Sequence, residues 1–429
     1  MIKILTHSIL TIFSAVVISC TVAYGQNISF SSLTTENGLS NMTVNDIYID
    51  EYGMVWIGTN YGLNRYNGHS IDVFHNEKGN PESIPSGNIL RITGDQKGHV
   101  WVVCQTGIAE FDLNTARIRT IYKGDARSIY YDKDRDELYA CVKRKILKWN
   151  PEKKRFGNAL TLEITSAIND IVRSKDYMLI GTSGNGTWRM NMTNNALECI
   201  ISTAHATRLY KDSKDNVWIG TWAKGLFKYD TEGTITSLRH DDKNPKSLSS
   251  DFVRCCCEDD TGKIWIGTIL GLECYNPATG EITQYSNDKS AYSRLNHSSV
   301  WCTIKDKQGN IWIGTYYGGV NWFNPQHEVY TWYLPSTTEG KGLSSAIIGC
   351  IREDKKGNLW VATEGGGLNF IDRKTGNTKW YTTKSCGLSS NNIQSLYYEE
   401  DKDAIWVGTH LGGLNRLDIK SGRAKTYRF

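Results

Sequence analysis

Short apolar runs alternate with glycine-rich turns along most of the chain. A run such as Val55–Thr59 has a tryptophan at its second position and continues into the spacing Gly-Thr-x-x-Gly, which ends at Gly62. Before each run lies another apolar segment, which ends in an Asp-x-x-Gly turn such as Asp50–Gly53. No stretch keeps a sustained helical spacing of apolar positions. The pattern therefore predicts short β-strands joined by tight turns, in which Asp caps the turn and Gly takes the left-handed backbone position.

This pattern occurs nine times, at intervals of 38 to 48 residues. Seven copies are clear, and two degenerate copies begin at Leu138 and Leu179. Each copy predicts four short antiparallel strands, which is the blade of an all-β propeller. The residues that anchor the nine copies are Trp56, Trp101, Tyr139, Leu179, Trp218, Trp265, Trp312, Trp360 and Trp406.

The segment before the first copy, "NISFSSLTTENGLS", matches the fourth-strand segment of later units. A propeller ring closes when a strand from one terminus completes the blade at the other, which removes an open edge. We therefore expect residues 28–31 to complete the blade around Trp312. On this interpretation residues 26–325 form a seven-bladed β-propeller, and residues 326–429 form two blades of an incomplete second propeller. A single eight- or nine-bladed ring is the alternative.

The first residues, "MIKILTHSILTIFSAVVISCTVAYGQ", have a positive start and an apolar stretch, and end in small residues. This pattern predicts a secretory signal peptide over residues 1–25, and hence a periplasmic protein. A retained membrane anchor is an alternative, and Cys20 lies in a poor context for lipidation. No later segment has the ~20 apolar residues of a membrane span. We expect no membrane contact beyond the signal peptide.

The charge of the chain is nearly balanced, with a net charge of +4 and 22% charged residues. Nothing in this balance favours a nucleic-acid partner. No zinc-ligand spacing, nucleotide signature or catalytic carboxylate pair stands out, so we predict no metal, no cofactor and no catalytic residues. Cys255, Cys302 and Cys350 each lie ten residues before a repeat tryptophan. We expect them to be packing residues rather than disulfide partners, because innermost propeller strands splay apart.

The Gly-Thr-x-x-Gly segment could suggest a phosphate-binding loop. Such a loop precedes a helix, however, whereas this segment lies between two strands and recurs in each blade, so we interpret it as a hairpin. The variable positions inside it are not fixed by the scaffold, and aromatic and polar side chains there could bind a sugar. They could equally cover neighbouring blades or dock a second ring. The candidate ligand-binding residues are Asn60, Tyr61, Trp222, Lys224, Tyr316, Tyr317 and His410.

The stretch "ISFSSLTTENGLSNMTVNDIYIDEYGMVWIGTNYGLNRYNG" resembles the start of the periplasmic sensor region of hybrid two-component regulators of Bacteroidetes-type bacteria. The resemblance extends over residues 27–429 and rests on two-component-regulator propeller repeats. In that family two seven-bladed propellers precede an immunoglobulin-like domain, a membrane helix, a histidine kinase, a receiver and a DNA-binding domain. Because this chain ends after the ninth repeat, the resemblance implies a fragment or a truncated product.

The resemblance implies a non-catalytic, exported module that binds an oligosaccharide and belongs to a signalling receptor, which acts as a homodimer. Two other functions remain open at this point. One is a glycan lyase or hydrolase on a propeller scaffold, and the other is a protein-interaction propeller without a small ligand.

Overall fold

The structure is a computed structural model that describes residues 28–174, 176–202, 204–286, 295–326 and 333–428. The predicted signal peptide, residues 1–25, lies outside these residues. The fold is all-β, as predicted from the sequence. Contacts between Cα atoms divide the chain into two compact units, Met1–Glu328 and Val329–Phe429, and each is described separately below.

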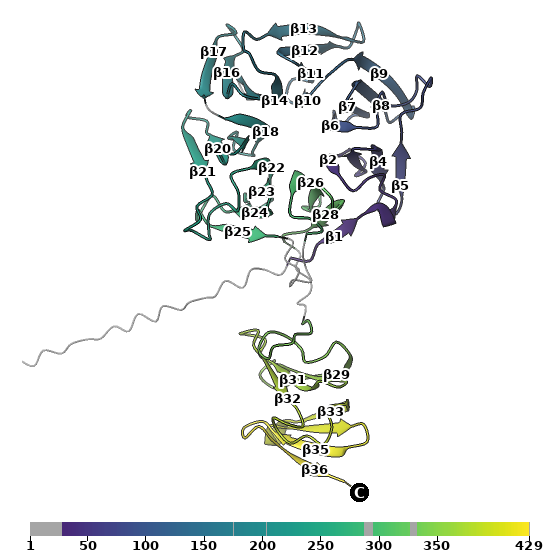
Figure 1. Ribbon diagram of the computed structural model, residues 1–429, viewed down its shortest axis with the longest axis vertical. Coiled ribbons are helices and arrows are strands. Elements are labelled where there is room, and N and C mark those ends of the chain that lie inside the picture. The colour runs from purple at the N-terminus through teal and green to yellow at the C-terminus, as the bar shows by residue number, and fades with distance from the viewer. Residues whose placement is uncertain (1–27, 175, 203, 287–294, 327–332, 429) are drawn as a thin grey trace, which may run out of the picture. The chain divides into compact units, whose positions relative to one another are not determined.

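In the described part of the first unit, the strands form seven four-stranded antiparallel sheets, here called blades one to seven (Figure 1). Blades one to three contain β2 (Val44–Ile49), β3 (Val55–Thr59), β4 (Gly62–Tyr66), β5 (Ile71–Phe74), β6 (Ile89–Gly94), β7 (His99–Cys104), β8 (Gly107–Asp112), β9 (Arg117–Lys123), β10 (Ser128–Asp132), β11 (Glu137–Val142), β12 (Lys145–Asn150) and β13 (Arg155–Thr161). Blades four to six contain β14 (Ile168–Arg173), β15 (Tyr177–Thr182), β16 (Thr187–Asn191), β17 (Leu197–Ile201), β18 (His205–Lys211), β19 (Val217–Trp222), β20 (Leu226–Tyr229), β21 (Ile235–Leu238), β22 (Val253–Glu258), β23 (Ile264–Thr268), β24 (Leu272–Tyr275) and β25 (Ile282–Tyr285).

Blade seven combines strands from the two ends of the first unit. It contains β26 (Val300–Lys305), β27 (Ile311–Thr315), β28 (Val320–Phe323) and β1 (Ser31–Leu33), and a short 3-10 helix, η1 (Thr35–Asn37), follows β1. Strand β1 pairs antiparallel with β28, with Leu33 opposite Val320. The pairing begins later than the 28–31 expected from the sequence, because Ile28 and Phe30 pack into the core instead, and Phe30 meets Phe323 edge to face.

The innermost strand of each blade contacts the innermost strand of the next, and β26 contacts β2 in turn. Figure 1 shows these strands nearest the centre of the ring, with purple β1 beside green β28. The ring of the first unit is therefore closed, and β1 covers the edge that β28 would otherwise expose.

A buried hydrogen bond links the turn and the second strand of most regular blades. The Nε1 of Trp56 donates to Asp50 Oδ2 over 2.8 Å, while Asp50 Oδ1 accepts the backbone N–H groups of Tyr52 and Met54. One Asp thus fixes both its own turn and the core indole, which explains why the two residues recur six positions apart. The same bond joins Trp218 to Asp212, Trp265 to Asp259, Trp312 to Asp306 and Trp360 to Asp354.

The glycine of the Trp-x-Gly-Thr segment is required by the neighbouring blade. A Cβ on Gly58 would lie 2.6 Å from Ile89 Cγ2, and one on Gly314 would lie 2.6 Å from Val44 Cγ1. Gly62 ends the hairpin with φ of +124°, a left-handed conformation that favours glycine. These contacts support a structural role for the glycines, as predicted, and not a phosphate site.

The second unit contains two four-stranded sheets in its described part, built on the same pattern. Their strands are β29 (Ile348–Glu353), β30 (Leu359–Thr363), β31 (Gly367–Ile371), β32 (Thr378–Tyr381), β33 (Ile393–Glu399), β34 (Ala404–Thr409), β35 (Gly413–Asp418) and β36 (Arg423–Tyr427), with a 3-10 helix, η2 (Glu400–Lys402). Ile348 and Ile351 of β29 are exposed, whereas most of the corresponding strands of the first unit are largely buried. Within the residues that the structure covers, no helix is long and apolar enough to cross a membrane.

Candidate functional site

The hairpin between the second and third strands of a blade lies beside the start of its innermost strand. Thr59 pairs with Val44 in blade one, Thr268 with Val253 in blade six, and Thr315 with Val300 in blade seven. The hairpins of the first unit therefore share one face of the ring, here called the hairpin face. The Asp-x-x-Gly turns lie at the opposite ends of these strands, on the turn face.

Near the hairpin face the pairing of the innermost strand shifts by one residue, which forms a β-bulge. The bulge residues of the first unit are Asn45, Leu90, Asn169, Thr207, Arg254 and Trp301. Asn45 Nδ2 donates to Ile89 O over 2.7 Å, Asn169 Nδ2 to Ala206 O over 2.8 Å, and Thr207 Oγ1 to Val253 O over 2.7 Å. In these blades the bulge side chain ties its own blade to the next one.

Blades six and seven depart from this arrangement, because their bulge residues are large and contact each other. The Cζ of Arg254 lies 4.6 Å from the ring centroid of Trp301 and 5.1 Å from that of Trp222. Both distances are within the range of a cation–π interaction. The Nε of Arg254 and the Nε1 of Trp301 are buried and have no hydrogen-bond partner among the described residues.

Aromatic side chains surround this pair on the hairpin face. Trp222 meets Phe252 edge to face at 5.2 Å, and Tyr316 stacks on Trp301 at 5.2 Å with an interplanar angle of 22°. Tyr317 meets Tyr316 at 4.9 Å. Trp222 is 45% exposed and Tyr317 is 63% exposed, so large apolar faces remain open to solvent. We call Trp222, Phe252, Arg254, Trp301, Tyr316 and Tyr317 the aromatic cluster.

Three of the seven candidate residues, Trp222, Tyr316 and Tyr317, thus meet in one place. Lys224 is exposed in the hairpin that follows Trp222. Asn60 and Tyr61 lie in blade one, where Asn60 Oδ1 accepts from Asn45 Nδ2 and the Tyr61 ring lies 5.3 Å from that of His75.

His410 belongs to the second unit, where its backbone N–H donates to Asn392 O. The repeat gives it a hairpin position equivalent to those of the first unit.

Sequence reasoning missed Arg254 and Trp301, the two residues at the centre of the cluster. Both directly precede a cysteine that was singled out, Cys255 and Cys302. A comparison of the residue one position earlier in each repeat, Asn45, Asn169 and Thr207 against Arg254 and Trp301, would have found the departure.

The residue that follows each bulge in the sequence lies on the inner wall of the ring. Arg208 Nη2 donates to Asp46 Oδ1 over 3.0 Å and so links two blades that are not neighbours. Asp170 accepts from Ser128 Oγ and from the backbone N–H of Leu209. Cys255 and Cys302 occupy the same layer and are buried, which raises the pKa of both thiols. These cysteines are free and pack as predicted.

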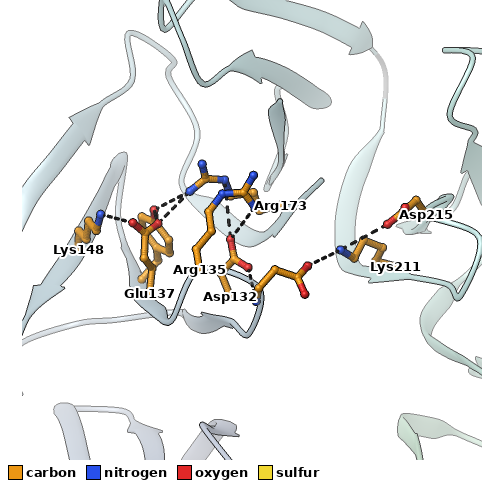
Figure 2. Close-up of polar contacts among 9 residues, drawn as sticks. Asp132, Arg135, Glu137, Lys148, Arg173, Lys211 and Asp215 are labelled. Atoms are coloured by element: carbon orange, nitrogen blue, oxygen red, sulfur yellow. Dashed lines mark hydrogen bonds and ion pairs between the residues drawn. The ribbon is translucent and has the colours of Figure 1, made fainter. Parts of the chain in front are cut away.

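Blades three and four lack the tryptophan–aspartate bond, and a charged network on the turn face takes its place (Figure 2). Arg173 Nη1 donates to Glu137 Oε2 over 2.9 Å and to the hydroxyl of Tyr139 over 3.2 Å, and its Nε lies 3.7 Å from Asp132 Oδ2. The cation of one blade thereby stabilises carboxylates of the preceding blade.

Glu137 of this network does not have the properties of a general acid. Burial of Glu137 would raise its pKa, but hydrogen bonds from Lys148 and Tyr139 outweigh burial and lower the pKa below its usual value. A general acid needs a raised pKa. The described residues also contain no cluster of three or more His, Cys, Asp or Glu side chains that could hold a metal ion.

Comparison with known proteins identifies the repeats. The two component regulator propeller family matches residues 38–61, 247–269, 294–317 and 342–365. The histidine kinase P4 of Formosa agariphila is 41% identical over 64 residues, which are 15% of this chain and 4% of the kinase. The chain thus spans only a small part of the curated relative it matches. These matches confirm the resemblance drawn from the sequence.

Solved structures support the fold. An extracellular domain attributed to a hybrid two component system of B. thetaiotaomicron aligns with a TM-score of 0.74 at 21% identity, over 94% of this chain and 55% of that one. A streptogramin B lyase aligns with a TM-score of 0.54 at 12% identity, over 69% of this chain and 98% of the lyase. At these identities the likeness shows the propeller fold alone.

Proposed function

The chain carries two component regulator propeller repeats, and on that premise we propose that it is a periplasmic, non-catalytic sensor module of a hybrid two-component receptor. Its ligand is an oligosaccharide, bound on the hairpin face at the aromatic cluster. The observation that carries this proposal is the exposure of Trp222, Tyr316 and Tyr317 around a central arginine.

The chemistry of the aromatic cluster suits a sugar. Pyranose rings present apolar C–H faces that pack on aromatic rings, and their hydroxyl groups need polar partners. Trp222 and Tyr317 offer exposed rings, while Arg254 Nε and Trp301 Nε1 offer buried donors without partners. An unsatisfied buried donor is costly, so a polar group that reaches either nitrogen would stabilise the cluster.

Signalling in this proposal is a population shift. A ligand that contacts one arrangement of a receptor homodimer better than another favours that arrangement by the difference in binding free energy. The proposal therefore requires differential contacts from the hairpin face, where the scaffold is constant and the variable side chains gather.

Isothermal titration calorimetry against a panel of plant, algal and host oligosaccharides tests the proposal. We expect at least one oligosaccharide to bind, and Trp222→Ala and Tyr317→Ala to weaken its binding about tenfold or more, which is about 1.4 kcal/mol. Tyr52→Ala is a matched control, since Tyr52 is 65% exposed but lies on the turn face.

Two results would contradict the proposal. Release of reducing ends from a polysaccharide by the purified protein would identify a propeller-fold glycan hydrolase or lyase instead. The absence of heat and of a change in melting temperature across the whole panel would favour a protein-interaction propeller without a small ligand.

A further inference from the structure

Arg254 differs from the other arginines that lie over an aromatic ring. Arg65 lies over Trp56 and forms an ion pair with Asp72 at 2.7 Å, and Arg416 lies over Trp406 and forms one with Glu399 at 2.9 Å. Arg119, over Trp149, is paired with Glu110. Arg254 has no ion pair with any described residue. Its charge is therefore balanced only by the faces of two indole rings.

The surroundings of Arg254 leave this charge poorly solvated. The guanidinium is partly buried between Trp222 and Trp301, and its Nε has lost water without gaining a partner. A half-buried cation without a counter-charge is unfavourable, and a charge-assisted hydrogen bond to an anion is among the strongest polar contacts available to it.

The hairpins of the first unit add no negative charge to this face. They comprise residues 60–61, 105–106, 143–144, 183–186, 223–225, 269–271 and 316–319, and none of these positions holds Asp or Glu. Lys143, Arg144 and Lys224 instead make the hairpins basic. The loops that join one blade to the next also end at this face and carry acidic residues, among them Asp251, which pairs with Arg239. The preference for an anion therefore rests on Arg254 itself and not on the net charge of the face.

A groove between blades two and three contrasts with the surroundings of Arg254 in the pairing of its charges. It encloses about 1180 Å³ and contains many charged side chains, but most of its cations already have carboxylate partners. Lys97 pairs with Asp136 at 3.0 Å and Lys148 with Glu137 at 2.6 Å. Size alone would favour this groove as a ligand site. The charge of Arg254, which no carboxylate balances, favours the aromatic cluster as the site of an anionic ligand.

We infer that the ligand of the aromatic cluster carries an anionic group, a sugar carboxylate or sulfate, which binds the guanidinium of Arg254 while the sugar ring packs on Trp222. This inference rests on the proposed oligosaccharide-binding function and narrows its ligand to acidic glycans. Carboxylate and sulfate share the chemistry that Arg254 recognises, namely two oxygens that can accept from its fork of N–H donors.

Matched pairs of probes test the inference on the whole chain by isothermal titration calorimetry. One pair is an oligogalacturonate and the same oligomer after carboxyl reduction, and the other is a sulfated galactan oligosaccharide, which contains no carboxylate, before and after desulfation. We expect an acidic member to bind and its neutral counterpart to bind at least tenfold more weakly. Raising the salt concentration should weaken only the acidic member, because salt screens the ionic contact.

Variants assign the effect to Arg254. Arg254→Gln removes the charge at similar size and should weaken binding of the acidic probe about tenfold or more, while Arg254→Lys should retain part of it. Arg65→Gln, an arginine already paired with Asp72, is the matched control and should leave binding unchanged. Circular dichroism of each variant shows whether its fold is intact.

The outcomes separate this inference from the function on which it rests. Equal affinity for acidic and neutral members of a pair, or full affinity in Arg254→Gln, would overturn the anionic ligand while leaving an oligosaccharide sensor in place. Binding of no oligosaccharide of either charge would overturn the proposed function and this inference with it.

Discussion

Blades one and six are built from closely similar sequences, yet they use two equivalent positions differently. At the bulge, blade one has Asn45, whose side chain donates a hydrogen bond to blade two. Blade six has Arg254, whose side chain makes no hydrogen bond to blade seven and lies between the indole rings of Trp222 and Trp301. On the third strand, blade one has Asn64 and blade six has Glu273. The same repeat position can therefore stabilise the contact between blades in one blade and be free for another role in a second.

The third-strand position of blade one needs a side chain that both accepts and donates a hydrogen bond. Asn64 Oδ1 accepts from the backbone N–H of Ser40 over 2.9 Å, and its Nδ2 donates to Ile57 O over 3.1 Å. Glu273 accepts from the hydroxyl of Ser249, but it has no amide to donate. Burial raises the pKa of Glu273 to about 8, against the opposing effect of its hydrogen bonds to Ser249 and Thr268.

The largest expected effect follows from this raised pKa. Between pH 4.5, its ordinary pKa, and about pH 8, native Glu273 keeps its proton while the unfolded chain has released it. The free energy of unfolding should therefore fall as pH rises through this window, by about 1.4 kcal/mol per pH unit. Glu273→Asn removes this dependence and should stabilise the first unit by on the order of 3 kcal/mol at pH 7.5.

Urea unfolding at several pH values between 5 and 8 measures this difference. The reverse change, Asn64→Glu, should create the same pH dependence in blade one. Parallel pH profiles for the wild type and Glu273→Asn would show that Glu273 does not titrate as described.

The next effect on stability concerns a glycine that both blades have at the contact with the following blade. A Cβ on Gly58 would lie 2.6 Å from Ile89, and one on Gly267 would lie 2.5 Å from both Cys255 Sγ and Val300 Cγ1. Gly58→Ala and Gly267→Ala should each destabilise the ring by about 1–3 kcal/mol, because the next blade must move. Thermal melts would check this, with Gly53→Ala as a contrast whose cost comes from its left-handed backbone rather than from a clash. A neutral result for Gly58 and Gly267 would show that adjacent blades pack less closely than described.

A smaller difference in stability is expected between variants of the two bulge residues, Asn45 and Arg254. Asn45→Ala removes the bond to Ile89 O and should cost about 1 kcal/mol. Arg254→Ala should cost less, since Arg254 makes no hydrogen bond to the described residues. Urea unfolding of the two variants under the same conditions compares them, and a larger loss for Arg254→Ala would mean that the aromatic cluster is part of the scaffold.

The fold was accessible from the sequence because its determinants are local and repeated. The spacing of Asp50 and Trp56 is set by one hydrogen bond, and Gly58 is required by one close contact with the next blade. Because both features recur in other copies, each of these copies supports the prediction of a propeller blade. The hairpin residues Trp222, Tyr316 and Tyr317 were also identifiable, as the positions that the repeat leaves free.

Arg254 and Trp301 were not identified, because their importance depends on contacts between blades. Asn45, Asn169 and Thr207 show that the bulge normally ties neighbouring blades, and this rule appears only when the donors and acceptors of adjacent strands are seen together. His410 belongs to the second unit, and its role in ligand binding stays a prediction.

The variant Arg254→Asn shows whether blade six has given up a structural hydrogen bond in order to bind a ligand. It restores the residue of blade one, whose amide can tie blade six to the carbonyl of Val300 in blade seven. Urea unfolding and calorimetric titration with an acidic oligosaccharide that binds the wild type should give opposite changes. We predict equal or greater stability, by up to about 1 kcal/mol, together with at least tenfold weaker binding. Unchanged binding, or a loss of stability, would show that Arg254 serves the scaffold and does not bind the ligand.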